Sequence, residues 1–508
     1  MALRTPSINL SALKLPETLP NPGLLVGWSL EHEHPHRAIG FHYGEPEKSP
    51  KTGYVDPIQL SREGHLITLA PTGAGKGVGC IIPALLLHDG PVIVIDPKGE
   101  NVAVTARRRR EMGHEVIVID PMGITGFESA SLNPLDLVDV ESPMAIDDVA
   151  AIVETLWHSH GTAPRDQFWV GRAKHLVTAL VLHTLIVEPP ERRNFDTVRA
   201  LIAQTVTAGN PQPGNGHSGL LQILAESLHP EVRRIAGSIL VPARETFGSI
   251  ASFAQELTDF LRGPVLAQAT GSTSFSLDAV TRGDPLSIYL VLPPHMLESH
   301  GRVLRLWIST LIGAVTRRRR KPERSTLFIL DEAAQLGALP QLRQAITLLR
   351  GYGLQTWSFW QDKSQLQMLY PHDWKTMVNN CRVLQCFGAL NMNASRDIAE
   401  MTGFDTPEAV LDLREDEMVL QLAGDDAVVA RVPNYLKDEP FIGLYDENPY
   451  YSDHGSVMPR PHPMGKYFSR GQSWAEKTNG KEGTAHPLPD TGPDALLNRL
   501  LAREARKR

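Results

Sequence analysis

The feature that most limits the fold of this chain is a series of short apolar runs that alternate with helical patterns. The clearest runs are His65–Ala70, Val92–Asp96, Val116–Asp120, Ser287–Leu292, Leu327–Asp331 and Thr356–Gln361. Strands with helices on both faces are apolar along nearly their whole length, because neither face meets water. The alternation therefore predicts an α/β fold, with a parallel sheet and crossover helices. The polar residues that end several runs would lie at the carboxyl edge, where α/β proteins place their sites.

The 508 residues divide into segments of different character. Residues 1–38 are rich in proline and histidine and are predicted to form an irregular arm. Residues 39–165 and 282–434 carry the strand signal, and we expect them to form two halves of one nucleotide-binding motor domain. Helical patterns dominate residues 166–281, which predicts an inserted all-α domain. Proline, glycine and charge dominate residues 435–508, which predicts a flexible tail.

The tail ends in a segment with helical periodicity. Residues 493–508 place four leucines in an apolar stripe beside five basic residues, which predicts a terminal amphipathic helix. Docking on a partner is one interpretation of this helix. Packing on the protein's own body, or fraying in solvent, is equally compatible with the pattern.

Composition excludes several other classes of protein. The formal net charge of −7 means that any surface for nucleic acid must be local, such as the lining of a ring. Three cysteines without metal-type spacing argue against a disulfide framework and fit a reducing compartment. The N-terminus lacks the apolar region of a signal peptide, and no uninterrupted apolar run approaches ~18–20 residues. We therefore expect a cytoplasmic protein with no transmembrane segment of its own.

Residues 70–77, APTGAGKG, form a glycine-rich turn between a predicted strand and a predicted helix. Such a turn can point backbone N–H groups at phosphate oxygens, and Lys76 would bridge the β- and γ-phosphates. The other residues predicted to contact the nucleotide are Thr72, Gly73, Ala74, Gly75, Gly77 and Val78. Gly77 departs from the usual pattern, because a Ser or Thr hydroxyl normally ligates Mg²⁺ at that place. Water or another residue must then hold the ion.

Two adjacent acids, Asp331 and Glu332, end a later apolar run. P-loop ATPases need one carboxylate to hold Mg²⁺ through its water shell and another to polarise the attacking water. We assign the metal to Asp331 and the water to Glu332, although an apolar strand ending in two acids also fits a solvated strand end. Gln361 ends the next run, where its amide can sense the γ-phosphate or orient the water. A structural hydrogen bond is the alternative role for Gln361.

Several motifs together resemble the type IV secretion coupling proteins of the TraG class. In chain order they are APTGAGKGVG, VIVIDPKGEN, SLNPLD, QFWVGRAKHL, ILDEAAQLGALP and RGYGLQ. The matching motifs span roughly residues 64–405. The resemblance implies a RecA-like P-loop NTPase sheet, interrupted by an all-α domain and assembled as a ring, usually a hexamer. It also implies ATP and Mg²⁺ as cofactors.

Rings of this kind bind ATP between neighbouring subunits, and one subunit supplies an arginine finger to the next. The resemblance makes Arg350 the candidate finger and Arg343 the fallback, with a structural ion pair as the alternative. In the DPKGEN motif, Asp96 and Lys98 are expected near the nucleotide, in contact with either the ligand or another subunit. The basic runs Arg107–Arg110 and Arg317–Arg320 fit either solvated helix ends or sequence-independent DNA contacts.

The implied function is an ATPase that pumps DNA, carried as a relaxase–DNA complex, into a type IV secretion or conjugation channel. Its implied partners are single-stranded DNA, the relaxase, the channel components and further copies of the chain. Members of this family usually begin with transmembrane helices, so a peripheral attachment to the inner membrane is expected instead. Two alternatives remain open. They are a soluble DNA-translocating ATPase unrelated to secretion, and a nucleotide-gated recruitment platform with little hydrolysis.

Overall fold

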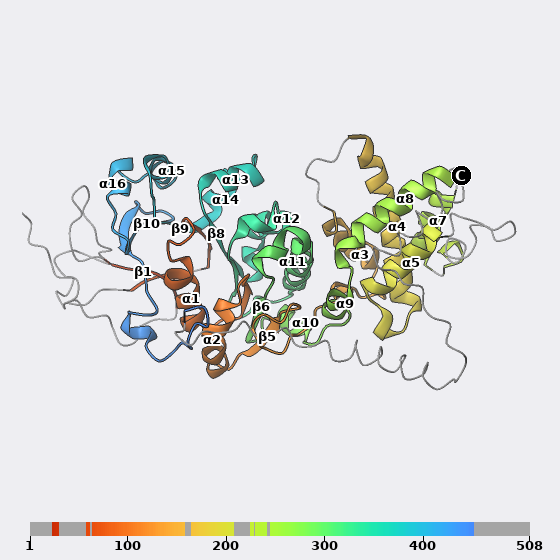
Figure 1. Ribbon diagram of the computed structural model, residues 1–508, viewed down its shortest axis with the longest axis horizontal. Coiled ribbons are helices and arrows are strands. Elements are labelled where there is room, and N and C mark those ends of the chain that lie inside the picture. Colours follow the sequence, from red (N-terminus) through yellow and green to blue (C-terminus); the bar gives the residue numbers. More distant parts are fainter. Residues whose placement is uncertain are drawn as a thin grey trace, which may run out of the picture. The chain divides into compact units, whose positions relative to one another are not determined.

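The computed structural model describes residues 23–29, 57–60, 63–157, 164–207, 224–227, 229–240 and 244–451. Its centre is an 11-stranded sheet in the order β2-β1-β11-β10-β9-β3-β8-β7-β4-β6-β5 (Figure 1). The strands are β1 (Leu24–Trp28), β2 (Pro57–Leu60), β3 (His65–Leu69), β4 (Val92–Ile95), β5 (Glu115–Ile119), β6 (Leu286–Leu290), β7 (Thr326–Leu330), β8 (Leu354–Trp360), β9 (Cys381–Cys386), β10 (Glu417–Leu422) and β11 (Val428–Arg431).

The run of strands from β9 to β5 is parallel, and the four strands beyond β9 are antiparallel. Each of the six apolar runs in the sequence forms one of the parallel strands, so the predicted α/β fold is confirmed. Because the strands are parallel, the residues that follow β3, β7 and β8 meet at one edge of the sheet. This edge carries the phosphate loop and the two acids.

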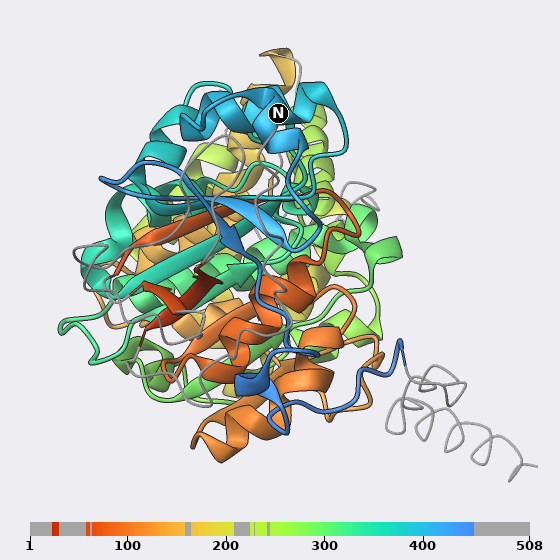
Figure 2. The same ribbon diagram turned by 90° about the vertical axis from the view of Figure 1, so that its left-hand side faces the viewer.

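Helices cover both faces of the sheet (Figure 2). On β4, Val92 and Val94 pack in one apolar cluster, whereas Ile93 and Ile95 pack in another, as alternating strand residues must. The first cluster includes α1 (Ile82–Leu87) and α2 (Glu100–Glu111). The second includes α11 (Pro294–Thr316), α12 (Pro340–Leu348) and α14 (Trp374–Asn380). Three further helices are α13 (Lys363–Leu369), α15 (Met392–Thr402) and α16 (Pro407–Leu411).

The described residues between 164 and 282 contain helices and loops but no strand. The helices are α4 (Pro164–Val187), α5 (Phe195–Thr207), α7 (Pro230–Leu240), α8 (Arg244–Thr258), α9 (Pro264–Ala269) and α10 (Leu277–Arg282). α4 packs against α5, α7 and α8, and also against α3 (Ala145–Thr155), which in turn contacts α11. The bounds 166–281 for an inserted domain remain a prediction, because α3 joins both groups of helices.

One described helix, Asp166–Val187, is long and apolar enough to cross a membrane. However, 67% of its most apolar window is buried inside the protein, as expected for the central helix of a packed bundle. Length and composition alone are therefore weak evidence for a membrane span.

Two predictions about the chain ends need correction. The predicted irregular arm contains β1, which is buried and pairs with β2 and β11. The predicted flexible tail begins with packed chain, because Tyr435 and Phe441 are buried in the same cluster as Trp28. Local composition led to both errors, because each segment is stabilised by contacts with the other end of the chain and not by residues near it in the sequence. The helix predicted at residues 493–508 lies outside the described residues.

Candidate functional site

The phosphate loop follows β3 and leads into a helical turn at Gly77–Ile81, which continues as α1. Gly73 and Gly75 have φ angles of 83° and 89°, a left-handed conformation that favours glycine. A Cβ atom added at Gly73, Gly75 or Gly77 would meet no other atom within 4 Å. The loop is thus an open cradle beside these three glycines, as the close approach of a phosphate group requires.

Lys76 lies across this cradle and is only 8% exposed. Its Nζ donates to the carbonyl oxygens of Ala70 at 3.0 Å and Pro71 at 3.4 Å. The same atom is 3.6 Å from Oε1 of Glu332. The lysine and the second acid, which are far apart in the sequence, therefore lie in direct ionic contact.

Glu332 has an unusual backbone, with φ 55° and ψ 50°. It is the one non-glycine residue with positive φ in the described part of the chain. Such a conformation costs an L-residue about 1–2 kcal/mol, so the surrounding structure must impose it. The left-handed turn directs Glu332 away from the direction of β7 and toward Lys76. On its other side, Nε2 of Gln361 donates to Oε2 of Glu332 at 3.1 Å.

Asp331 and Asp96 follow the neighbouring strands β7 and β4. Asp96 is buried, whereas the Asp331 side chain keeps partial contact with solvent at the edge of the sheet. Burial and the nearby Glu332 raise the pKa of Asp331 to about 6, against the opposing effect of Lys76. Burial raises the pKa of Asp96 to about 7, although its carboxylate accepts hydrogen bonds from the Val102 backbone at 2.9 Å and the Asn101 side chain. Asp96 thus caps the start of α2, whereas its expected contact with the nucleotide or with another subunit stays a prediction. Sequence reasoning had not found this cap.

Comparison with known proteins agrees with this geometry. Residues 40–419, which are most of the chain, match the family described as type IV secretory system conjugative DNA transfer. The chain belongs to this family. The conjugal transfer protein TraG of Escherichia coli is 24% identical over 405 residues, which are 76% of this chain and 62% of TraG. The coupling protein VirD4 of Bartonella quintana (strain Toulouse) is 26% identical over 352 residues, which are 68% of this chain and 53% of VirD4.

A solved structure of the plasmid coupling protein TrwB with an ATP analogue has the same fold. Its TM-score is 0.56 at 14% identity, and the match covers 73% of this chain and 85% of TrwB. The RecA-like architecture that the sequence motifs imply is therefore confirmed. The chain spans about three-fifths or less of the length of the two curated relatives.

Arg350, the expected arginine finger, lies far from the phosphate loop of its own subunit. Arg350 is exposed and precedes β8, whereas Gln361 follows this strand. β8 has 7 residues, so its two ends are about 23 Å apart. Arg350 instead lies near His65, whose pKa is lowered to about 4 by burial and further by this guanidinium. Arg343 is 3.5 Å from Asp373, which fits the structural ion pair expected as the alternative role. Arg350 could therefore reach a phosphate only in a neighbouring subunit.

The two basic runs are partly structural. Arg109 is fully buried and donates to Ser287 Oγ at 2.8 Å and to the Gly90 carbonyl at 2.6 Å. Arg318 is buried as well and donates to Thr326 Oγ1 at 2.7 Å. These two arginines fit neither solvated helix ends nor DNA contacts, whereas the neighbouring residues 319 and 320 are exposed. Hydrophobic periodicity could have placed Arg109 on the inner face of its helix.

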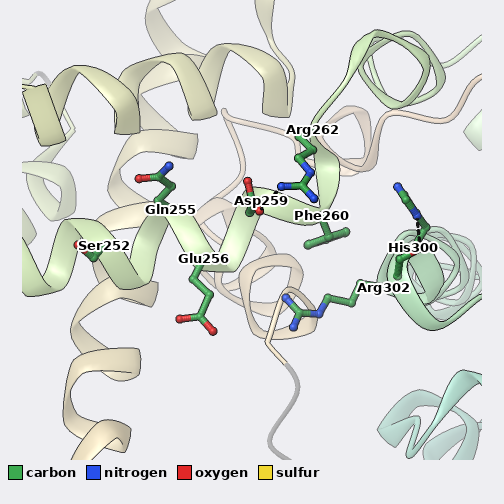
Figure 3. Close-up of a pocket in the computed structure, with 9 residues that line it drawn as sticks. Ser252, Gln255, Glu256, Asp259, Phe260, Arg262, His300 and Arg302 are labelled. Carbon is green, nitrogen blue, oxygen red and sulfur yellow. Dashed lines mark hydrogen bonds and ion pairs between the residues drawn. The ribbon is translucent and has the colours of Figure 1, made fainter. Parts of the chain in front are cut away.

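A second hollow lies between the end of α8 and the start of α11 (Figure 3). Glu256 and Asp259 face it from one side and Arg302 from the other, with the Arg302 guanidinium 5.7 Å from the centre of the Phe260 ring. Its lining includes no residue of the phosphate loop, β7 or β8. It is therefore separate from the candidate nucleotide site.

Proposed function

We propose that this chain is an ATP-driven coupling protein that moves DNA, as a relaxase–DNA complex, into a type IV secretion or conjugation channel. The observation that carries the proposal is the convergence of Lys76, Glu332 and Gln361 beside an open glycine cradle. A cation, a carboxylate and an amide in this arrangement have the chemistry needed to bind a triphosphate and direct water at its terminal phosphorus. The name of the relative TraG supports conjugal transfer as the process served, and that of VirD4 supports coupling to a type IV secretion system.

The residues present fit a nucleotide with Mg²⁺. The cradle has room for phosphate oxygens, and the partly exposed carboxylate of Asp331 would hold the ion through its water shell. Because Gly77 has no hydroxyl group, it would not ligate the ion, and Asp331 would hold it instead. Bound Mg²⁺ neutralises charge on the β- and γ-phosphates. TrwB, which shares the fold, has been solved with an ATP analogue and with ADP and Mg²⁺, which supports the same cofactors here.

In the proposed mechanism, the Lys76 ammonium binds the β- and γ-phosphate oxygens, which compete with its present carbonyl partners. The Glu332 carboxylate accepts a hydrogen bond from the attacking water and polarises it. The Gln361 amide, which already donates to Glu332, keeps that carboxylate turned toward the phosphate. Arg350 would complete the site from the neighbouring subunit of a ring, where its guanidinium offsets charge on the phosphates.

A recruitment platform with little hydrolysis is the second candidate, because Gly77 removes a normal metal ligand. Glu332→Gln separates the two. The coupling proposal predicts that wild-type protein hydrolyses ATP faster with single-stranded DNA, and that the variant binds ATP normally but loses hydrolysis. Glu408→Gln, an exposed acid on α16, serves as the matched control and should hydrolyse like wild type. Slow wild-type hydrolysis that DNA does not change would favour the platform.

A further inference from the structure

Lys363 is a buried lysine that the proposed mechanism does not use. It is the first residue of α13 and lies two positions after Gln361. Its side chain is only 8% exposed, and its Nζ donates to Glu400 Oε2 at 2.5 Å and to Asp397 Oδ1 at 3.3 Å, both on α15. The same ammonium is 5.7 Å from the centre of the Trp374 ring. A buried charge is costly unless it is paired, so these contacts hold the start of α13 against α15.

The first turn of α13 holds Gln361 in place. The Gln361 backbone N–H donates to Gln365 Oε1 at 2.9 Å. The Gln365 backbone N–H donates in turn to Oδ1 of Asp362, the residue that caps α13, at 3.0 Å. α13 also packs against β8 and against the short helical turn Ala333–Leu336, which follows Glu332. The Gln361 amide, which donates to Glu332 at 3.1 Å, is therefore positioned by α13.

Helix α15, which carries the two acids, is itself fixed beside the phosphate loop. The chain leaves β9 next to β3, where the Phe387 N–H donates to the Leu69 carbonyl oxygen at 3.1 Å. A Cβ atom added at Gly388 would lie 2.7 Å from the Ala74 Cβ, so the backbone there packs directly on the phosphate loop. Three residues later, Asn391 caps α15. α15 is thus an anchor whose place is set by the same loop that would hold the phosphates.

We propose that Lys363 is a positioning residue for ATP hydrolysis. Its ion pairs with α15 set the place of α13, and α13 in turn orients the Gln361 amide and the Glu332 carboxylate. This inference rests on the proposed function, in which Glu332 polarises the attacking water. Since the Lys363 ammonium faces α15, its loss should slow turnover and leave binding at the phosphate loop unchanged.

The test measures turnover and binding separately. Full-length Lys363→Met keeps a long side chain but removes the charge. ATPase rates at saturating ATP with single-stranded DNA give kcat, and titration with the β,γ-imido analogue of ATP and Mg²⁺ gives Kd. A displacement of about 1 Å near reacting groups can cost about a hundredfold in rate, so we expect kcat to fall about tenfold to hundredfold with unchanged Kd. Lys375→Met is the matched control and should behave as wild type, because Lys375 is an exposed lysine 5.5 Å from the centre of the same Trp374 ring.

Three further variants separate positioning from a loss of stability. Lys363→Arg keeps a cation for both acids and should recover most of the rate. Glu400→Gln removes the nearer acid, whose side chain is 70% exposed, so the variant should fold as wild type does while its kcat falls. Adding Lys363→Met to Gln361→Ala should slow hydrolysis no further than Gln361→Ala alone, because both changes act through the same amide.

Three results would overturn this inference while wild type still hydrolyses ATP. They are an unchanged kcat for Lys363→Met, an equal loss of kcat and affinity, and losses that multiply in the variant that also carries Gln361→Ala. Should Lys363→Met fail to fold, an unchanged kcat for Glu400→Gln would overturn it and a lowered kcat would support it. Wild-type protein that fails to hydrolyse ATP would refute the proposed function, and this inference with it.

Discussion

Replacing Asp438 by alanine should destabilise the contact between β1 and the residues that follow β11. The carboxylate joins Trp28 of β1, Arg431 of β11 and the backbone of Asn434, and it is fully buried. Removing one partner of a buried ion pair costs about 3–5 kcal/mol, because the remaining charge loses its partner away from water. The Arg431 side chain is 21% exposed, so water can reach it in part, and we expect a loss near the lower limit, about 3 kcal/mol.

The measurement is urea unfolding of the full chain, followed by tryptophan fluorescence. Asp446→Ala is the control, because it removes an ion pair with Arg107 in which both side chains are about two-fifths exposed. Water screens such an exposed pair, so the control should lower the free energy of unfolding only slightly. A loss for Asp438→Ala as small as that of the control would show that residues 434–445 do not stabilise the sheet.

Three further predictions follow from the site. The folded-state pKa of Asp96, about 7, lies above its unfolded value of 3.8, so stability falls as pH rises between these two values, where only the unfolded state has released the proton. Asp96→Asn should reduce this fall between about pH 4 and 7, and an unchanged slope in urea titrations would contradict it. Gly77→Ser should keep stability within about 0.5 kcal/mol, because its Cβ meets no atom within 4 Å, and should strengthen the Mg²⁺ dependence of ATP binding measured by titration. Mixing inactive Arg350→Ala with inactive Lys76→Ala should restore part of the ATPase rate if the arginine acts on a neighbour, whereas no recovery would exclude that role.

The parallel strands were predictable because both faces of each strand are buried, which leaves nearly continuous apolar runs in the sequence. Strand β1 was not predictable in the same way. It is short, lies among prolines, and depends on a hydrogen bond from Trp28 to Asp438, a residue 410 positions away. The same long-range contact explains why composition made residues 435–445 look like a tail.

The convergence of Lys76 and Glu332 was predictable from the strand–loop–helix context and the acid pair, because parallel strands end at one edge. The left-handed backbone of Glu332 was not, since only the surrounding packing imposes it. Nor did the motif around Asp96 show that its carboxylate caps α2, because a cap depends on where the next helix begins. The site roles of Arg350 and of the loop amides stay predictions.

The most direct test of this account is equilibrium binding of Mg²⁺ and a non-hydrolysable ATP analogue to full-length wild type and Lys76→Ala. The buried ammonium should contribute about 1.5–3 kcal/mol to phosphate binding, so the variant is predicted to bind roughly tenfold to hundredfold more weakly while its circular dichroism stays unchanged. Equal affinity of the two proteins, or no binding by folded wild type, would contradict the claim that residues 72–77 hold a triphosphate.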